Sequence, residues 1–401
     1  MPKIRITEID NTGRVSSTET PNVVYIPGPA DKAVAPVLFT NASLFKKAVD
    51  DGTYAEGLSA KMAYHLLTLG MHVLYEGVVA DSETSDAVIN WDILTDKNLY
   101  NVRFLTTGQF FQGIQDGVKM IKCAATRCDA VALIDIATEN NAVSEYRTAI
   151  ETINTSAKAL NLTSTKEPST FAAAFAPTWT GNLNSMSDAA IEKIENLPAS
   201  FGYLCAFARS VKENPMWYAV AGSFRGIIPE LVAVAKEYNS SDIEMLQARS
   251  KNAEVALDDA GDNVGVAINP IAYRRPFGHL IWGNRTLRDN EADTSGAGVT
   301  KATSFLNCRI LSTEVAKVAF NAANKYTFEQ NSEILWTNFT SYILPTLDRM
   351  STGNGILDYK ISRIPTNKKA RLCAKISLIP IEAVEDFDIT IELTDEISVT
   401  E

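Results

Sequence analysis

The stretch between residues 100 and 137 most constrains the fold. "YNVRFLTT" at 100–107 is typical of a strand, and "GQFFQGIQDGVKMIKCAATRC" at 108–128 predicts a helix with an apolar face. "DAVALIDIA" at 129–137 is a continuous apolar run of the kind found in strands buried on both faces. Strand, helix and buried strand form a βαβ unit, which requires some parallel sheet. The predicted fold class is therefore α/β, in a mixed α+β architecture.

The rest of the chain offers further strands and helices. Strands are expected at 23–30, 72–79 and 171–179, and helices at 41–52, 57–70 and 143–160. Residues 182–260 carry mostly helical signals, including "SDAAIEKIENL" (187–197) and "IPELVAVAKEY" (228–238). Ser312 is expected to cap a helix, and a second helix should cover 332–350 with Pro345 kinking or ending it. Strands at 355–364 and 370–381 follow.

Both ends of the chain carry an alternating strand pattern beside polar segments. "KIRITEI" at 3–9 alternates, and so does "DFDITIEL" at 386–393. Because unpaired strands are a liability, we expect each to pair with a neighbouring subunit. Head-to-tail exchange does not close on itself and therefore builds a helical polymer. The residues expected in these inter-subunit strand arms are Ile4, Arg5, Ile6, Ile9, Phe387, Ile389, Ile391 and Leu393.

Charge and cysteine content narrow the class of protein. A net charge of -11 argues against nonspecific nucleic-acid binding. The five cysteines are odd in number and scattered, which favours free buried thiols over a zinc site or disulfides. The opening "MPKIRITEID" lacks the apolar core of a leader peptide, and no run reaches membrane-spanning length. We expect synthesis and folding in the bacterial cytoplasm.

The sequence lacks the common catalytic motifs. It contains no GxxxxGK[ST], HExxH or GxSxG pattern. His65 and His72 are interpreted as structural histidines, and Asp135 as a carboxylate bonded to a neighbouring loop or strand end. We therefore predict no catalytic, metal or cofactor residues, and no enzyme activity.

Arg274, Arg275, Arg285 and Arg288 form a notable basic cluster. Arginine clusters can bind phosphate or nucleic acid. Since the chain is acidic and no exposed aromatic residues are expected among these arginines, ion pairs between proteins are the favoured interpretation.

The stretch "AINPIAYRRPFGHLIWGNRTL" at 267–287 resembles the C-terminal signature of contractile tail sheath proteins. The later "FEQNSEILW" is similar to a second motif of that family, and "FLNCRIL" looks like its arginine-bearing strand before a helix. "IRITEID" resembles the family's N-terminal arm. The match is densest over 263–395, and over 80–260 it holds only in the order of elements. The matched signature residues are Asn269, Gly278, Trp282, Gly283, Arg285, Thr286, Leu287, Phe328, Asn331 and Trp336.

The resemblance implies an architectural role for the signature and a division of the chain. Its glycines would allow tight turns and close backbone approach, Trp282 would fill the core, and Arg285 would pair with a carboxylate or carbonyl. The implied parts are an N-terminal arm (1–20), a first part of the core sheath domain (21–80), a middle outward-facing α/β domain (81–262), a C-terminal sheath domain facing the tube (263–385) and a C-terminal arm (386–401).

The implied function is that of a structural subunit in a phage tail, tailocin or related contractile injection particle. Copies would polymerise helically around an inner tail tube, with baseplate and tail-terminator proteins as further partners, and contraction would drive the tube through an envelope. No nucleic acid, membrane insertion or cofactor is implied. The expected tube-facing residues are Glu314, Lys317, Lys325 and Arg349. The alternatives are another virion tail component with a sheath-like domain, such as a baseplate or tail-terminator protein, and an unrecognised cytoplasmic α/β enzyme.

Overall fold

The structure is a computed structural model. It describes residues 21–79, 89–111, 114–165, 167–187, 190–247, 265–288, 301–367 and 369–384. The strand arms expected at 1–20 and 386–401, with all eight of their named residues, lie outside the described residues.

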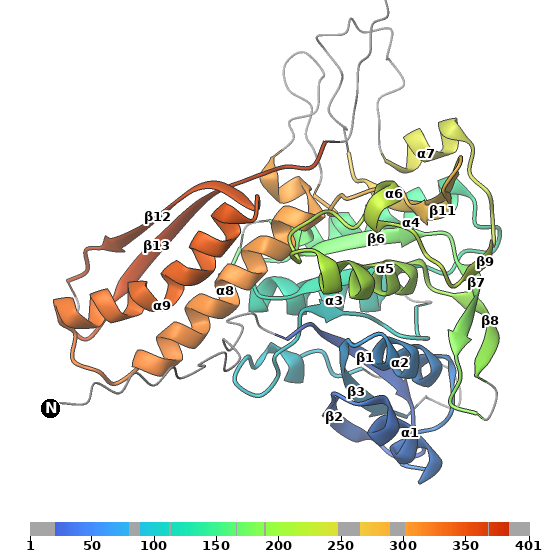
Figure 1. The fold of residues 1–401 in the computed structure, drawn as a ribbon, viewed down its shortest axis with the longest axis horizontal. Coiled ribbons are helices and arrows are strands. Elements are labelled where there is room, and N and C mark those ends of the chain that lie inside the picture. The colour runs from blue at the N-terminus through green and yellow to red at the C-terminus, as the bar shows by residue number, and fades with distance from the viewer. Residues whose placement is uncertain are drawn as a thin grey trace, which may run out of the picture.

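An eight-stranded sheet forms the centre of the molecule (Figure 1). Its six inner strands are parallel, and the edge strands β11 and β2 are antiparallel to their neighbours. In spatial order they are β11 (Gly278–Ile281), β10 (Ile268–Arg274), β6 (Ala172–Ala176), β5 (Val131–Ile134), β4 (Phe104–Leu105), β1 (Val23–Pro29), β3 (His72–Val78) and β2 (Val34–Phe39). The predicted βαβ unit is confirmed, because β4 and β5 are parallel neighbours joined through α3 (Ile114–Arg127).

Helices cover both faces of this sheet. Side chains of β1 alternate between two cores, with Val24 and Ile26 on one face and Val23 and Tyr25 on the other. The first face packs against α1 (Ala42–Asp50), α2 (Leu58–Thr68), α5 (Ala199–Glu213) and α8 (Leu306–Tyr326). The second packs against α3, α4 (Val143–Lys158) and α7 (Ser240–Leu246). This is a doubly wound α/β arrangement, and short 3₁₀ turns lie at Ile93–Thr95, Pro168–Phe171 and Ala302–Ser304.

A second sheet corrects the helical prediction for residues 182–260. Its order is β8 (Ile191–Leu197), β7 (Trp179–Asn184), β9 (Leu231–Val234), all antiparallel. "SDAAIEKIENL" and "IPELVAVAKEY" therefore contribute strands, with only α5, the four-residue α6 (Gly222–Arg225) and α7 helical among the described residues of this region. In β8 a register shift sets Ile194 and Leu197 against Gly181 and Trp179, so two buried residues three apart share a face. Buried residues three positions apart are also typical of one face of a helix, which is why this strand was predicted to be helical.

Helices α8 and α9 (Glu333–Thr352) and the hairpin of β12 (Ile356–Ile364) and β13 (Cys373–Pro380) form a lobe beside the central sheet (Figure 1). "FLNCRIL" is the start of α8 rather than a strand. Ser312 is inside that helix and donates to the Arg309 carbonyl, so it is not an N-cap. Ser332 does cap α9, and this helix continues past Pro345 to Thr352.

The expected domain division does not follow the sheets. Strands from 21–80, 81–262 and 263–385 all lie in the eight-stranded sheet, and β4, β5 and β6 from the middle range are among its central strands. The boundaries at 80/81 and 262/263 therefore cut one continuous sheet.

Candidate functional site

Asn269 ties together the signature stretch. Its Nδ2 donates to the Ala174 carbonyl at 3.0 Å and to the Arg285 carbonyl at 2.8 Å, and its Oδ1 accepts the Arg285 backbone N–H at 2.7 Å. Gly283 makes this possible, because a Cβ there would lie 2.7 Å from the Asn269 Oδ1. The buried amide thus joins β6, β10 and the turn after β11.

The end of the signature is buried as well. Arg285 is 7% exposed, and its guanidinium carbon lies 4.4 Å from the centroid of the Phe305 ring. Thr286 donates its N–H to the Ser304 carbonyl, and Leu287 donates to the Ala172 carbonyl. The run "NRTL" therefore joins the chain before α8 to the central sheet, which is an architectural role.

Trp282 does not fill the core. It is 36% exposed, lies just beyond β11, and has the Arg274 guanidinium 4.6 Å from its ring centroid. Gly278 at the hairpin turn has φ +82°, a left-handed conformation that suits glycine, so the expected tight turn is confirmed.

The four arginines of this region separate into two pairs. Arg285 and Arg288 are buried, and Arg288 pairs with Glu167 at 3.3 Å. Arg274 and Arg275 lie at the tip of the β10–β11 hairpin. Tyr273, Phe277 and Trp282 in the same hairpin are 49%, 51% and 36% exposed, which corrects the expectation that no exposed aromatic residues accompany these arginines.

Two of the expected tube-facing residues are instead buried inside the fold. Glu314 Oε2 lies 2.6 Å from Arg103 Nη2, with both side chains 0% exposed. Lys317 Nζ donates to Asn101 Oδ1 at 2.6 Å and to the Val102 carbonyl at 2.7 Å. Glu314 and Lys317 therefore have no surface to offer to another protein. The expectation that both residues lie on an exposed polar face was wrong, because the first half of α8 is buried on nearly every side.

We call the polar contacts of Arg309, Glu314 and Lys317 the α8 seam. Lys317 also lies 3.4 Å from Asp129, whose carboxylate pairs with Arg127. Burial lowers the pKa of Lys317 to about 7, and Asp129 opposes that shift. Arg309 donates to the Thr170 carbonyl and hydroxyl at 3.0 and 2.7 Å. The α8 seam thus fixes α8 to segments beside β4, β5 and β6.

The other two expected tube-facing residues lie nearer the surface. Lys325 is exposed, and its Nζ lies 5.1 Å from the Tyr342 ring centroid. Arg349 is half-buried on α9.

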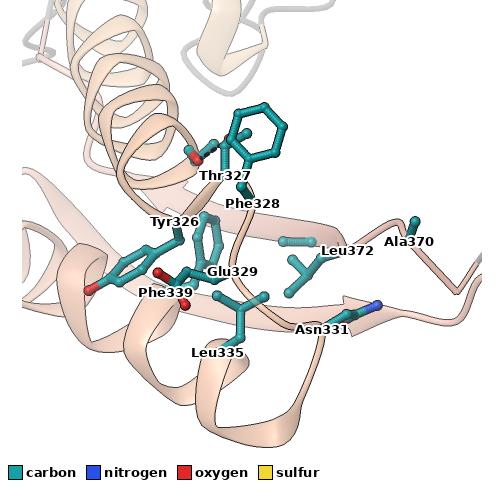
Figure 2. A pocket seen from close by; sticks show the side chains of 11 residues that line it. Tyr326, Thr327, Phe328, Glu329, Asn331, Leu335, Phe339, Ala370 and Leu372 are labelled. Carbon is teal, nitrogen blue, oxygen red and sulfur yellow. Dashed lines mark hydrogen bonds between the residues drawn. The ribbon is translucent and has the colours of Figure 1, made fainter.

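The second signature motif surrounds a pocket at the far end of the lobe. Phe328 is fully exposed with φ +75°, Asn331 Nδ2 donates to the Lys369 carbonyl at 2.8 Å, and Trp336 stacks on Phe339. Figure 2 shows the pocket, about 330 Å³ in volume, between the end of α8, the start of α9 and β13. Its lining residues are Ala323, Tyr326, Thr327, Phe328, Glu329, Asn331, Leu335, Phe339, Ala370, Leu372 and Ala374.

His65, Cys205 and Glu230 are a buried group with metal-ligand chemistry. His65 Nδ1 accepts the Asn184 backbone N–H at 3.0 Å, so Nε2 carries a proton and donates to Glu230 at 2.9 Å. Arg209 also binds the Glu230 carboxylate. Burial alone would raise the pKa of Glu230, but the bonds from His65 and Arg209 hold it at about 2. Because these bonds occupy the ligand atoms of His65 and Glu230, the group is structural and does not fit a metal ion.

Asp135 follows β5 and accepts hydrogen bonds from the backbone N–H of Ser200, at 2.8 Å, and from its hydroxyl, at the start of α5. The expected partner was a neighbouring loop or strand end, and the structure places it instead in the first turn of a helix. Burial raises the pKa of Asp135 to about 7 despite these bonds.

The crevice where doubly wound folds bind nucleotides is filled by the chain itself. It lies at the carboxyl ends of β1 and β4, where the strand order reverses. There Gln109 donates its N–H to Ser59 Oγ at 2.8 Å, and Ser59 donates its N–H to Gln109 Oε1 at 3.2 Å. A Cβ at Gly108 would lie 2.4 Å from both the Pro27 carbonyl and Ser59 Oγ. The described residues at the end of β1, the start of α2 and the loop after β4 are therefore in direct contact at this edge of the sheet.

No protein-family model and no curated protein matches the chain. Several solved structures are similar to it. The chain is similar to one in the sheath complex of an extracellular contractile injection system, PVC, in the contracted state, with 15% identity, TM-score 0.61, and coverage of 99% of this chain and 98% of that chain. It is similar to one in the contracted baseplate of the anti-feeding prophage (AFP), with 13% identity, TM-score 0.60 and coverage of 98% and 99%. A 6-fold symmetrised AFP baseplate gives 12% identity, TM-score 0.57 and 99% of both chains.

These likenesses define a class of fold: the chain has a sheath-like α/β fold over nearly its whole length, as the residues at 267–287 predicted. Among the helices of the described segments, none is both long enough and apolar enough to span a bilayer.

Proposed function

We propose that this chain is the structural subunit of a contractile sheath. The single observation that carries the proposal is the shared fold over 99% of this chain and 98% of a chain from a sheath complex. Copies would be made in the bacterial cytoplasm and assemble as a helical stack of rings around an inner tube. Contraction would then drive the tube through a target envelope.

A structural role, without enzyme activity or cofactor, agrees with the chemistry of the interior. The nucleotide crevice is filled by Ser59 and Gln109, and His65 and Glu230 use their ligand atoms in internal bonds. Energy would be stored in the assembled state and released by rigid-body repacking of subunits.

Strand exchange through 1–20 and 386–401 is the proposed linkage between subunits. It is supported by the β12–β13 hairpin, whose two strands pair only with each other among the described residues. Each outer edge of such a hairpin can accept a further strand.

The lobe of α8 and α9 is proposed to face the tube, and the surface segments of the 81–262 range, outside the central strands β4, β5 and β6, are proposed to face outward. Of the four expected contact residues, Lys325 and Arg349 remain candidates, since Glu314 and Lys317 are buried. Weak, salt-screened contacts suit a tube that must slide during contraction.

The test is negative-stain microscopy of the purified chain, expressed alone and with its cognate tube protein. Long tubes of defined diameter are expected. A chain that stays monomeric under both conditions, across protein and salt concentrations, would overturn the proposal.

The baseplate neighbours favour a second candidate. Two of the similar chains are from AFP baseplates, so this chain could belong to the base of such a particle rather than to its shaft. Closed rings that never extend into tubes would identify that role.

A further inference from the structure

The pocket at the far end of the lobe has an apolar lining (Figure 2). Leu335, Phe339 and Leu372 contribute to it, and its volume of about 330 Å³ is at the lower end of the range for ligand pockets, about 300–1,000 Å³. Phe328, which also lines the pocket, is fully exposed and has φ +75°. Backbone strain of this kind gathers at binding sites. The pocket therefore suits a large apolar side chain that comes from outside the described residues.

Basic side chains surround this pocket. Lys325, Lys369 and Arg371 are exposed, and each is next in sequence to a residue of the lining. Glu329 is the one acidic residue among the described lining residues, and nearby Glu333 is already held in an ion pair. We call the three basic residues the pocket rim. Its excess of positive charge favours an acidic segment.

One segment outside the described residues matches both the lining and the rim. Residues 385–401 contain seven acidic residues and no basic residue, whereas residues 1–20 contain three of each. Phe387 is the only aromatic residue of the sequence outside the described segments, and Ile389 and Ile391 follow it in alternation with polar residues. The C-terminal arm therefore offers an apolar side chain for the pocket and carboxylates for its rim.

A subunit cannot fill this pocket with its own Phe387. The Ile381 carbonyl lies 3.7 Å from Cys308 Sγ near the start of α8, whereas the pocket adjoins Tyr326 at the end of that helix. From Cys308 to Tyr326 the helix rises by eighteen residues, about 27 Å. The six residues from Ile381 to Phe387 span at most about 22 Å. Figure 1 also shows the red end of the described chain beyond β13 continuing away from the pocket.

We propose that this pocket receives Phe387 from the C-terminal arm of a second copy of the chain, and that the pocket rim binds carboxylates of the same arm. The inference rests on the proposed arm exchange between sheath subunits and names the receptor for one of the two arms. It follows that Phe387 occupies the pocket only when two copies meet.

The experiment measures the binding of a fluorescein-labelled peptide of residues 385–401 to the full-length chain by fluorescence anisotropy. The protein is kept below the concentration at which it self-associates. Ala370→Trp fills the pocket from an exposed position of its lining. Its matched control is Ala33→Trp, at an exposed position before β2.

A second pair of variants tests the charge of the pocket rim. Lys369→Glu with Arg371→Glu reverses two of its charges, and the control Lys119→Glu with Lys122→Glu changes the net charge equally on the exposed side of α3. Circular dichroism and melting temperature confirm that each protein is folded.

We expect the filled pocket and the reversed rim each to weaken peptide binding at least about tenfold, a factor that corresponds to about 1.4 kcal/mol. A peptide with Phe387→Ala should lose a similar factor, and salt should weaken the binding to the wild type. Both control proteins should bind like the wild type. A peptide that does not bind, or that binds Ala370→Trp as tightly as Ala33→Trp, overturns the proposal.

The identity of the arm and the sheath function are tested separately. A peptide of residues 1–20 that binds the pocket more tightly than the peptide of residues 385–401 would assign the pocket to the other arm and overturn the proposal. Peptide binding needs no polymer, so a chain that binds the peptide through the pocket but never forms tubes refutes the sheath function alone. A chain that forms tubes but binds the peptide elsewhere refutes this contact alone.

Discussion

Arg103 of the central sheet and Glu314 of α8 form an ion pair at 2.6 Å with neither side chain exposed to solvent. The two residues are 211 positions apart in the sequence. Their contact joins the start of β4 to the middle of α8, the helix that carries the C-terminal lobe.

Removing one charge of this pair should be costly. Glu314→Gln leaves the Arg103 guanidinium buried without its carboxylate, and we expect the free energy of unfolding to fall by about 3–5 kcal/mol. Urea denaturation measures it. The matched control, Lys119→Gln, removes an exposed pair with Asp116 and should cost at most about 1 kcal/mol. Equal effects of the two substitutions would mean that the buried pair stabilises the fold no more than the exposed pair does.

Asn269→Ala should destabilise the fold through the signature turn. The substitution removes three hydrogen bonds to backbone groups of Ala174 and Arg285, each contributing about 1 kcal/mol. We expect a loss of about 2–3 kcal/mol in urea denaturation. Asn324→Ala, which removes an exposed amide bonded only to Asn98 among the described residues, is the control and should be nearly neutral. A neutral Asn269→Ala would contradict the assignment of this amide as the central tie.

Arg285→Ala should lower the melting temperature through the loss of its contact with Phe305. Such cation–π contacts contribute about 0.5–2 kcal/mol, and the buried stem adds packing. Arg275→Ala, at the exposed hairpin tip, should leave the monomer's melting temperature unchanged. If the two substitutions behave alike, Arg285 has a surface role instead.

The stability of the protein should depend on Asp135 between about pH 4 and pH 7. Because the folded-state pKa of about 7 is above the ordinary value of 3.8, the folded state holds this proton more tightly than the unfolded state. Its contribution is complete at low pH and is lost as pH rises through 7, at up to about 1.4 kcal/mol per pH unit. Asp135→Asn should remove this slope from unfolding curves measured at pH 5, 6 and 7. The exposed-carboxylate control Asp31→Asn should retain it.

Deleting residues 1–12 or 386–401 tests the proposed arm exchange. Both truncated proteins should remain folded, because each keeps every described residue of the central sheet and the lobe. Neither should form tubes, since the exchanged strand is gone. Sedimentation and negative-stain microscopy report the result, and tubes from either truncation would show that the linkage lies elsewhere.

Much of the central sheet could be predicted from local pattern. The buried strand at 131–134 and the helix before it follow from a continuous apolar run beside a 3.6-residue period. The signature at 267–287 likewise predicted the fold that the solved structures share. Each of these features depends on residues that lie close together both in the sequence and in the structure.

Other features depend on contacts between distant segments. The helical pattern of β8 arises from its extra residue opposite β7, which depends on strand pairing. The resemblance implied a strand at "FLNCRIL", but Leu306 begins α8, and residues 304–311 are buried throughout. Glu314 and Lys317 looked solvent-facing because their partners, Arg103 and Asp129, lie about 200 positions earlier. Polar residues that satisfy one another inside a protein carry no local signature.

Helix α8 runs without interruption from its buried first half, held by the α8 seam, to a mostly exposed last turn that ends at Tyr326. Twenty-one residues of α-helix measure about 31 Å. The helix is therefore a rigid connection between the central sheet at its first half and the far end of the lobe. A force applied to the far end of the lobe would reach the central sheet along this helix, through its polar contacts at Arg309, Glu314 and Lys317.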